Sequence, residues 1–167
     1  MPRLLTTRSL TIIFVALGLT LAATPALAQS QPAWGNEMYE QMNPMVEKYN
    51  ENIRADDLGV AAGQLKGEKV NLVITDTDGS QATTSFRMDD QLNIRDLKQG
   101  ERDDATLKMS TDRATMEQII SADNPAIAFQ NAIASGDIEM DGLGATSAVK
   151  WAAINLASGI ARWLGLF

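Results

Sequence analysis

Residues 70–88 read VNLVITDTDGSQATTSFRM, and this stretch decides the fold. Apolar residues recur at alternate positions over 70–75 and again over 82–88, which is the two-residue period of a half-buried strand. Between the two runs, Asp78 and Gly79 form a dipeptide that favours a tight hairpin turn. The stretch therefore predicts two antiparallel strands with one apolar face.

Three further strands are expected after the hairpin, at 91–97, 105–109 and 137–141, because apolar residues alternate there between polar turns. Residues 55–68 are mixed in character and contain three glycines, so they are expected to form a loop.

Helices are expected on either side of these strands. Apolar residues recur every three or four positions over 38–53, although Asn43 followed by Pro44 leaves open two short helices or one kinked helix. Two more helices follow the strands, one capped by Ser110 or Thr111 and one running from Asn124-Pro125 to Gly136. Grouped strands with segregated helices predict an α+β domain with a largely antiparallel sheet.

The N-terminal segment has the form of a secretory signal peptide over residues 1–28. Arg3 and Arg8 precede an apolar run over 10–21, and Ala26-Leu27-Ala28 has the small-x-small pattern of a cleavage site. An uncleaved membrane anchor is the alternative, but the apolar run is shorter than the roughly 20 residues that a span requires.

Cleavage after the signal peptide would leave a flexible leader at 29–35 and a single domain at 36–167. We therefore expect a secreted or periplasmic protein.

Composition narrows the chemistry that the chain can perform. It has 21 acidic and 14 basic residues, a net charge of −7, no histidine and no cysteine. The negative charge disfavours nucleic-acid binding, and the missing residue types exclude disulfides, Ser-His-Asp and Cys-His catalysis and the common zinc sites. We expect no catalytic residues, no metal and no cofactor. The alternating Asp137, Glu139 and Asp141 are expected to form a solvated strand face.

Residues 146–167 form the most apolar stretch after the signal peptide. On a helical wheel their polar residues occupy only a little over a third of the circumference, and Lys150 and Arg162 argue against a membrane span. Such a helix could cover an apolar pocket, insert into a membrane interface or dock on a partner.

Three short motifs occur in order within the second half of the chain: DATLKMS at 104–110, DNPAIAF at 123–129 and GDIEMDG at 136–142. In this order they resemble the sterol carrier protein 2 family. The resemblance implies a roughly five-stranded sheet with helices on one side, and an apolar tunnel for sterols, fatty acids or acyl chains that the C-terminal helix closes. Members of that family are commonly intracellular, so the export signal is a departure from the pattern.

The sequence thus predicts an exported, non-catalytic protein that binds an apolar ligand, such as a lipid, fatty acid, sterol or isoprenoid, and carries or transfers it. The alternative is a module that acts through its C-terminal helix on a membrane surface or a partner, with a solid core. An enzyme that uses carboxylates or lysine ranks last, and the oligomeric state stays open. The expected lipid-binding wall consists of Phe86, Met88, Leu107, Met109, Met116, Ile120, Phe129 and Ile133, with Trp151 and Ile154 as the lid.

Overall fold

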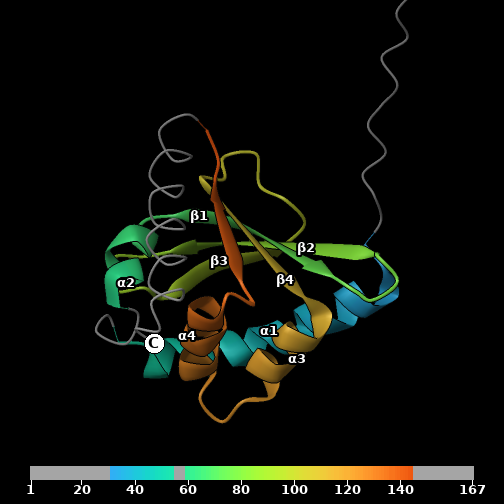
Figure 1. The fold of residues 1–167 in the computed structure, drawn as a ribbon, viewed down its shortest axis with the longest axis horizontal. Coiled ribbons are helices and arrows are strands. Elements are labelled where there is room, and N and C mark those ends of the chain that lie inside the picture. Colours follow the sequence, from blue (N-terminus) through green and yellow to red (C-terminus); the bar gives the residue numbers. More distant parts are fainter. Residues whose placement is uncertain (1–30, 55–58, 145–167) are drawn as a thin grey trace, which may run out of the picture.

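The computed structural model describes residues 31–54 and 59–144, and its centre is a five-stranded sheet (Figure 1). The strand order is β3-β2-β1-β4-β5; β1 and β4 are parallel, and the other neighbours are antiparallel. The strands are β1 (Lys69–Thr75), β2 (Gln81–Met88), β3 (Ile94–Gln99), β4 (Leu107–Asp112) and β5 (Glu139–Gly142).

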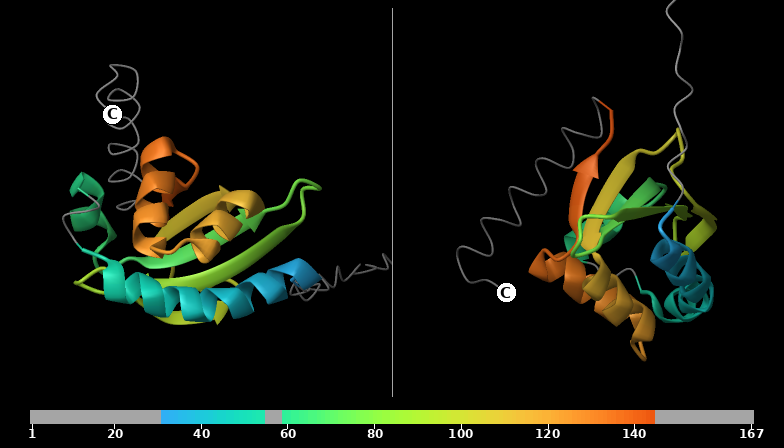
Figure 2. Two further views of the ribbon diagram at one scale, coloured as in Figure 1. Left: turned by 90° about the horizontal axis from the view of Figure 1, so that it is seen from below. Right: turned by 90° about the vertical axis from the view of Figure 1, so that its right-hand side faces the viewer.

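Helices cover one face of this sheet (Figure 2). Helix α1 contacts β2 and β3, α3 contacts β1 and β4, and α4 packs against both α1 and α3. This arrangement confirms the predicted α+β fold with a largely antiparallel sheet and helices on one side. The helices are α1 (Ala33–Asn52), α2 (Gly59–Leu65), α3 (Arg113–Ser121) and α4 (Pro125–Ser135).

The predicted hairpin is the pair β1–β2. Val70 lies opposite Phe86 and Leu72 opposite Thr84, so the apolar positions of both strands face the helices. At the turn, Gly79 has a φ of +83°, a conformation that favours glycine. Glycine at position 79 therefore suits the backbone conformation that this hairpin turn requires.

Helix α1 is a single helix rather than two short ones. Proline has no N–H and therefore removes one hydrogen bond of the helix. Pro44 lies on the exposed side of α1, so this bond is missing on the side away from the buried residues. The helix begins at Ala33, inside the segment expected to be a leader. Its first turn packs closely on the hairpin, because a Cβ added to Gly35 would lie 2.6 Å from the Cβ of Ala82.

Other expected boundaries were wrong as well; the fourth strand, for example, spans Leu107–Asp112 rather than 105–109. Residues 55–68 are not all loop, because α2 lies among them and buries Leu65 completely. The third strand begins only at Ile94, because Leu92 has a φ of 68° in the preceding turn. The cap of α3 is neither Ser110 nor Thr111.

The residue that caps α3 is Asp112, the last residue of β4. Its Oδ1 accepts a hydrogen bond of 2.7 Å from the N–H of Thr115, whereas the buried Thr111 donates to the carbonyl of Asp137. By contrast, the cap at Asn124 and the left-handed Gly136 that ends α4 confirm the prediction. The expected signal peptide and the C-terminal helix lie outside the described residues.

Candidate apolar binding site

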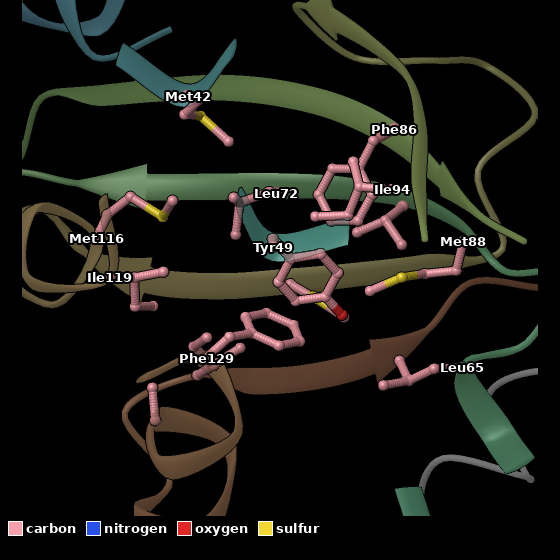
Figure 3. Close-up of a cluster of buried hydrophobic side chains, with 14 of the residues drawn as sticks. Met42, Tyr49, Leu65, Leu72, Phe86, Met88, Ile94, Met116, Ile119 and Phe129 are labelled. Atoms are coloured by element: carbon pink, nitrogen blue, oxygen red, sulfur yellow. The ribbon is translucent and has the colours of Figure 1, made fainter. Parts of the chain in front are cut away.

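The helical face of the sheet and helices α1, α3 and α4 enclose a wholly apolar space (Figure 3). Strand residues form one wall and residues of the three helices form the other, while Ile138 comes from the turn between α4 and β5. The lining residues are Met42, Met45, Tyr49, Leu72, Phe86, Ile94, Met116, Ile119, Phe129 and Ile138.

Helix α1 supplies three of the lining residues through its buried stripe. Met42, Met45 and Tyr49 follow one another at three- and four-residue spacing, which places them on the same side of the helix. Each is at most 4% exposed. The stripe therefore turns a continuous apolar surface toward the sheet.

The space itself is small. Its volume is about 20 Å³, which is close to the room that one water molecule needs, whereas ligand pockets usually have roughly 300–1,000 Å³. In this conformation the lining residues are thus packed closely around the space. A larger ligand requires the lining to move, and methionine is the apolar side chain best suited to repacking because it is unbranched and flexible.

Tyr49 is the one lining residue whose side chain carries a hydroxyl, although the atoms that border the space are all apolar. Its side chain is 1% exposed, and its ring meets that of Phe129 edge-on, with centroids 5.7 Å apart and an interplanar angle of 88°. Among the described residues, its hydroxyl is the one fully buried side-chain oxygen or nitrogen without a hydrogen-bond partner. Leaving a buried hydroxyl unpaired costs about 1–3 kcal/mol.

The environment of Tyr49 keeps that hydroxyl protonated. Burial raises its pKa well above the ordinary value of 10.0, and the negative charge of Asp89 raises it further. Since the phenol does not ionise near neutral pH, it remains a hydrogen-bond donor. The hydroxyl points toward the part of the core that holds Met88 and Leu65 (Figure 3).

The predicted wall residues occupy three positions relative to the space. Phe86, Met116 and Phe129 line it. Met88, Leu107 and Met109 are fully buried in the same core, and Ile120 and Ile133 are partly buried and pack against that core. Trp151 and Ile154, the expected lid, lie outside the described residues.

Seven lining residues were missed by the sequence prediction. The signal for three of them was present, because the stripe over 38–53 was recognised as one apolar helix face. What the spacing alone could not show is that this helix lies on the same face of the sheet as α3 and α4 and packs against them. The missed residues are Met42, Met45, Tyr49, Leu72, Ile94, Ile119 and Ile138.

A hollow of about 480 Å³, surrounded mainly by polar residues, lies beside the turn between β1 and β2. At its centre, Arg113 pairs with Asp76 and Glu117 at 2.8 Å each, and its guanidinium lies 5.1 Å from the ring centroid of Trp34. Both neighbouring carboxylates and one aromatic face thus engage the cation. These contacts join α1 and α3 to the hairpin.

No cluster of three or more acidic side chains able to hold a metal ion occurs within 31–54 and 59–144. Asp137, Glu139 and Asp141 are each exposed, in keeping with a solvated strand face. In the same part of the chain, no helix combines the length and apolar character needed to cross a bilayer.

The chain matches no protein-family model. It also matches no curated protein sequence.

The solved structures that are similar to the chain include three sterol carrier protein 2 or SCP2-type proteins. The apo form of sterol carrier protein 2 from Yarrowia lipolytica is 9% identical, with 70% of this chain and 89% of that one covered and a TM-score of 0.36. Sterol carrier protein 2 like 2 from Aedes aegypti is 14% identical, with 69% and 93% covered and a TM-score of 0.36. A ubiquinone synthesis protein, UbiJ-SCP2, is 11% identical, with 74% and 98% covered and a TM-score of 0.37. Likenesses this distant do not carry a function to this chain.

Proposed function

We propose that this protein binds an apolar ligand, a lipid or an isoprenoid-like molecule, within its core outside the cytoplasm, and that it carries the ligand without changing it. The observation that carries this proposal is the apolar space between the sheet and helices α1, α3 and α4. It is lined by aliphatic, aromatic and methionine side chains. This lining favours binding by burial of apolar surface, which contributes about 0.8 kcal/mol for each buried methylene.

Flexible side chains on several sides of the space support a site that expands around its ligand. Met42 and Met45 face it from α1 and Met116 from α3, so all three can change rotamer without moving the sheet. The three motifs at 104–110, 123–129 and 136–142, and the apolar stretch at 146–167, support the same function from the sequence.

Native mass spectrometry of the full chain, expressed with its own N-terminal segment and collected outside the cytoplasm, tests the proposal. We expect a species that begins at Gln29 and carries an apolar molecule at near-stoichiometric amount. Solvent extraction should return that molecule, and re-addition to stripped protein should leave its mass unchanged after prolonged incubation.

A matched pair of variants locates the site. Met116→Trp places a larger side chain in the lining and should reduce ligand loading, whereas Ile127→Trp adds the same side chain at a position that is 48% exposed and should not. A ligand-free mass together with no uptake of sterol, fatty alcohol or quinone probes would contradict the proposal. Chemical conversion of the ligand would contradict its non-catalytic part.

A further inference from the structure

Helix α1 extends along the sheet (Figure 2), and several contacts fix its N-terminal end to the β1–β2 hairpin. Just before the helix, the side chain of Gln31 bonds both the N–H and the carbonyl of Thr83 in β2. The indole N–H of Trp34 donates to the hydroxyl of Ser80 at 3.0 Å, and the Arg113 guanidinium lies over the same ring. The first turns of α1 are therefore tied to the sheet.

The second half of α1, residues 45–52, is attached to the sheet through one polar side chain. Asn50 donates from Nδ2 to the carbonyl of Ile94 at 3.1 Å and accepts from the N–H of Ile94 at 2.7 Å. Within 31–54 and 59–144, no other side chain of this half has a hydrogen bond or ion pair to another element. Its remaining contacts with the core come from apolar side chains and rings such as Met45 and Tyr49.

A proline separates the two halves of the helix. Pro44 has no N–H, so the helix bond that would join it to the carbonyl of Glu40 does not form, and helices bend most readily at such a position. Met42 precedes the proline, whereas Met45 and Tyr49 follow it. A bend at Pro44 therefore moves two lining residues of α1 and leaves the third in place.

Helices α3 and α4 have less freedom to move away from the sheet. No residue separates β4, which ends at Asp112, from α3, which begins at Arg113. Residues 122–124 join α3 to α4, and residues 136–138 join α4 to β5. Because each of these two helices is tied to a strand at one end and to the other helix at the other, the second half of α1 is the part of the wall that can open with the least disturbance of the sheet.

Two features of the closed state favour opening at this place. Ile94 lines the apolar space with its side chain while its backbone holds Asn50, so the polar attachment lies at the border of the space. The buried hydroxyl of Tyr49 has no partner among the described residues. It gains water as a partner when the second half moves outward, which offsets part of the cost of exposing the ring.

We propose that residues 45–52 form a hinged lid over the apolar space, that Pro44 is the hinge, and that the two bonds between Asn50 and Ile94 hold the lid closed. This inference rests on the proposed function and deepens it, because it names the place where the ligand enters and leaves the core. Opening the lid turns Met45 and Tyr49 away from the sheet and provides the expansion that a ligand needs.

Hydrogen exchange of the full chain, read from proteolytic fragments, tests the motion without a ligand. We expect the amides of 45–52 to exchange together and faster than those of 37–43, because the lid opens as a unit while the first half stays attached. Binding of the apolar fluorophore Nile red should slow the exchange of 45–52, since the bound ligand keeps the lid closed.

The latch is tested by the kinetics of Nile red binding. Asn50→Ala should raise the rates of uptake and of release by about tenfold each. The affinity should change much less, since the lid is closed both before and after binding. Asn52→Ala is the matched control, because Asn52 lies in the same half and its side chain bonds the carbonyl of Lys48 within its own helix at 2.7 Å. We expect Asn52→Ala to leave both rates as in the wild type.

The hinge is tested by a variant that should act in the opposite direction. Pro44→Ala restores the N–H that can bond the carbonyl of Glu40, so it should slow uptake, release and the exchange of 45–52 while the fold becomes no less stable. The control is Asn43→Ala, which changes the neighbouring exposed position and keeps the proline. We expect Asn43→Ala not to slow these rates.

The outcomes separate this inference from the proposed function. If 45–52 exchanges no faster than 37–43, or if Asn50→Ala and Asn52→Ala take up Nile red at the same rate, the lid is refuted while the binding function stands. If Pro44→Ala changes no rate, Pro44 is not the hinge and the inference fails. If the wild type binds neither Nile red nor the sterol, fatty alcohol and quinone probes, the proposed function fails, and the lid fails with it.

Discussion

Two buried polar side chains, one on each side of the sheet, differ in whether they are hydrogen-bonded. On the face away from the helices, both ends of the Asn71 amide bond the backbone of Arg102, with an Nδ2 to O distance of 3.2 Å and an N to Oδ1 distance of 2.9 Å. On the helical face, the Tyr49 hydroxyl has no partner among the described residues. The Asn71 amide therefore anchors the loop after β3, whereas the Tyr49 hydroxyl holds no other segment in place through a hydrogen bond.

Breaking the helical face should have the largest effect. Phe129→Ala removes a ring that is 7% exposed, lines the cavity and meets Tyr49 edge-on, so it should lower the free energy of unfolding by about 3–5 kcal/mol. Urea denaturation measures this loss. The control is Ile127→Ala on the exposed side of the same helix, where the change should stay within about 0.5 kcal/mol. Equal effects for the two variants would show that the cavity region is not the core.

Removing the Asn71 hydrogen bonds on the other face of the sheet should lower the stability by a smaller amount. Asn71→Leu leaves the N–H and the carbonyl of Arg102 without their side-chain partners, and we expect a loss of about 1–3 kcal/mol in the same denaturation assay. Asn71→Asp keeps an acceptor for the N–H of Arg102 and should lose a smaller amount. If both substitutions were neutral, the loop after β3 would not depend on this residue.

Substitution of Asp112, where β4 ends and α3 begins, should have the next largest effect on stability. Asp112→Ala removes the cap of α3 and should lower stability by about 1 kcal/mol, whereas Asp112→Ser keeps a capping oxygen and should retain most of it. Thermal unfolding of the two variants side by side measures the difference. Similar midpoints for the alanine and serine variants would mean that the cap contributes little.

Asp89 lies in the turn beside Tyr49, and its substitution should have the smallest effect. Burial alone would raise its pKa, but hydrogen bonds from Arg95, Asn93 and Gln91 outweigh burial and lower the pKa from 3.8 to about 2. A carboxyl group whose pKa is lower in the folded state stabilises the fold above its unfolded pKa and loses that contribution as the pH falls through the folded pKa.

Asp89→Asn should therefore lower stability near neutral pH by less than about 1 kcal/mol, since Arg95 is half-exposed and the ion pair is screened. The difference from the wild type should shrink as the pH falls from about 4 to about 2. Unfolding measured across this pH range checks the sign, and a difference that grows in acid would contradict it.

The sequence was sufficient for the fold wherever a local pattern had a single physical solution. Alternation on both sides of Asp78-Gly79 fixed the hairpin, and Asn124-Pro125 with Gly136 fixed both ends of α4. The pattern failed where a tertiary contact decides. Helix α2 forms among glycines because Leu65 is buried, and β4 runs on to Asp112 because Thr111 and Asp112 pair with Ile74 and Thr75 of β1.

The candidate site could be predicted only in part for the same reason. Periodicity placed Phe86, Met116 and Phe129 on inward faces, and the structure brings these three together. It could not show which of several inward faces meet around one space. Tyr49 was recognised only as part of an apolar stripe, because the lack of a partner for its hydroxyl becomes visible only when every neighbouring side chain is in place.

Oxidation of the cavity methionines can report how often the core opens to solvent. A thioether oxidises to a polar sulfoxide when peroxide reaches it, and Met42, Met45 and Met116 are at most 4% exposed. Oxidation at these three positions therefore requires the core to open, as it must when a ligand enters or leaves. The rate at which they gain oxygen measures how often that opening occurs, and a bound ligand that keeps the core closed would slow it.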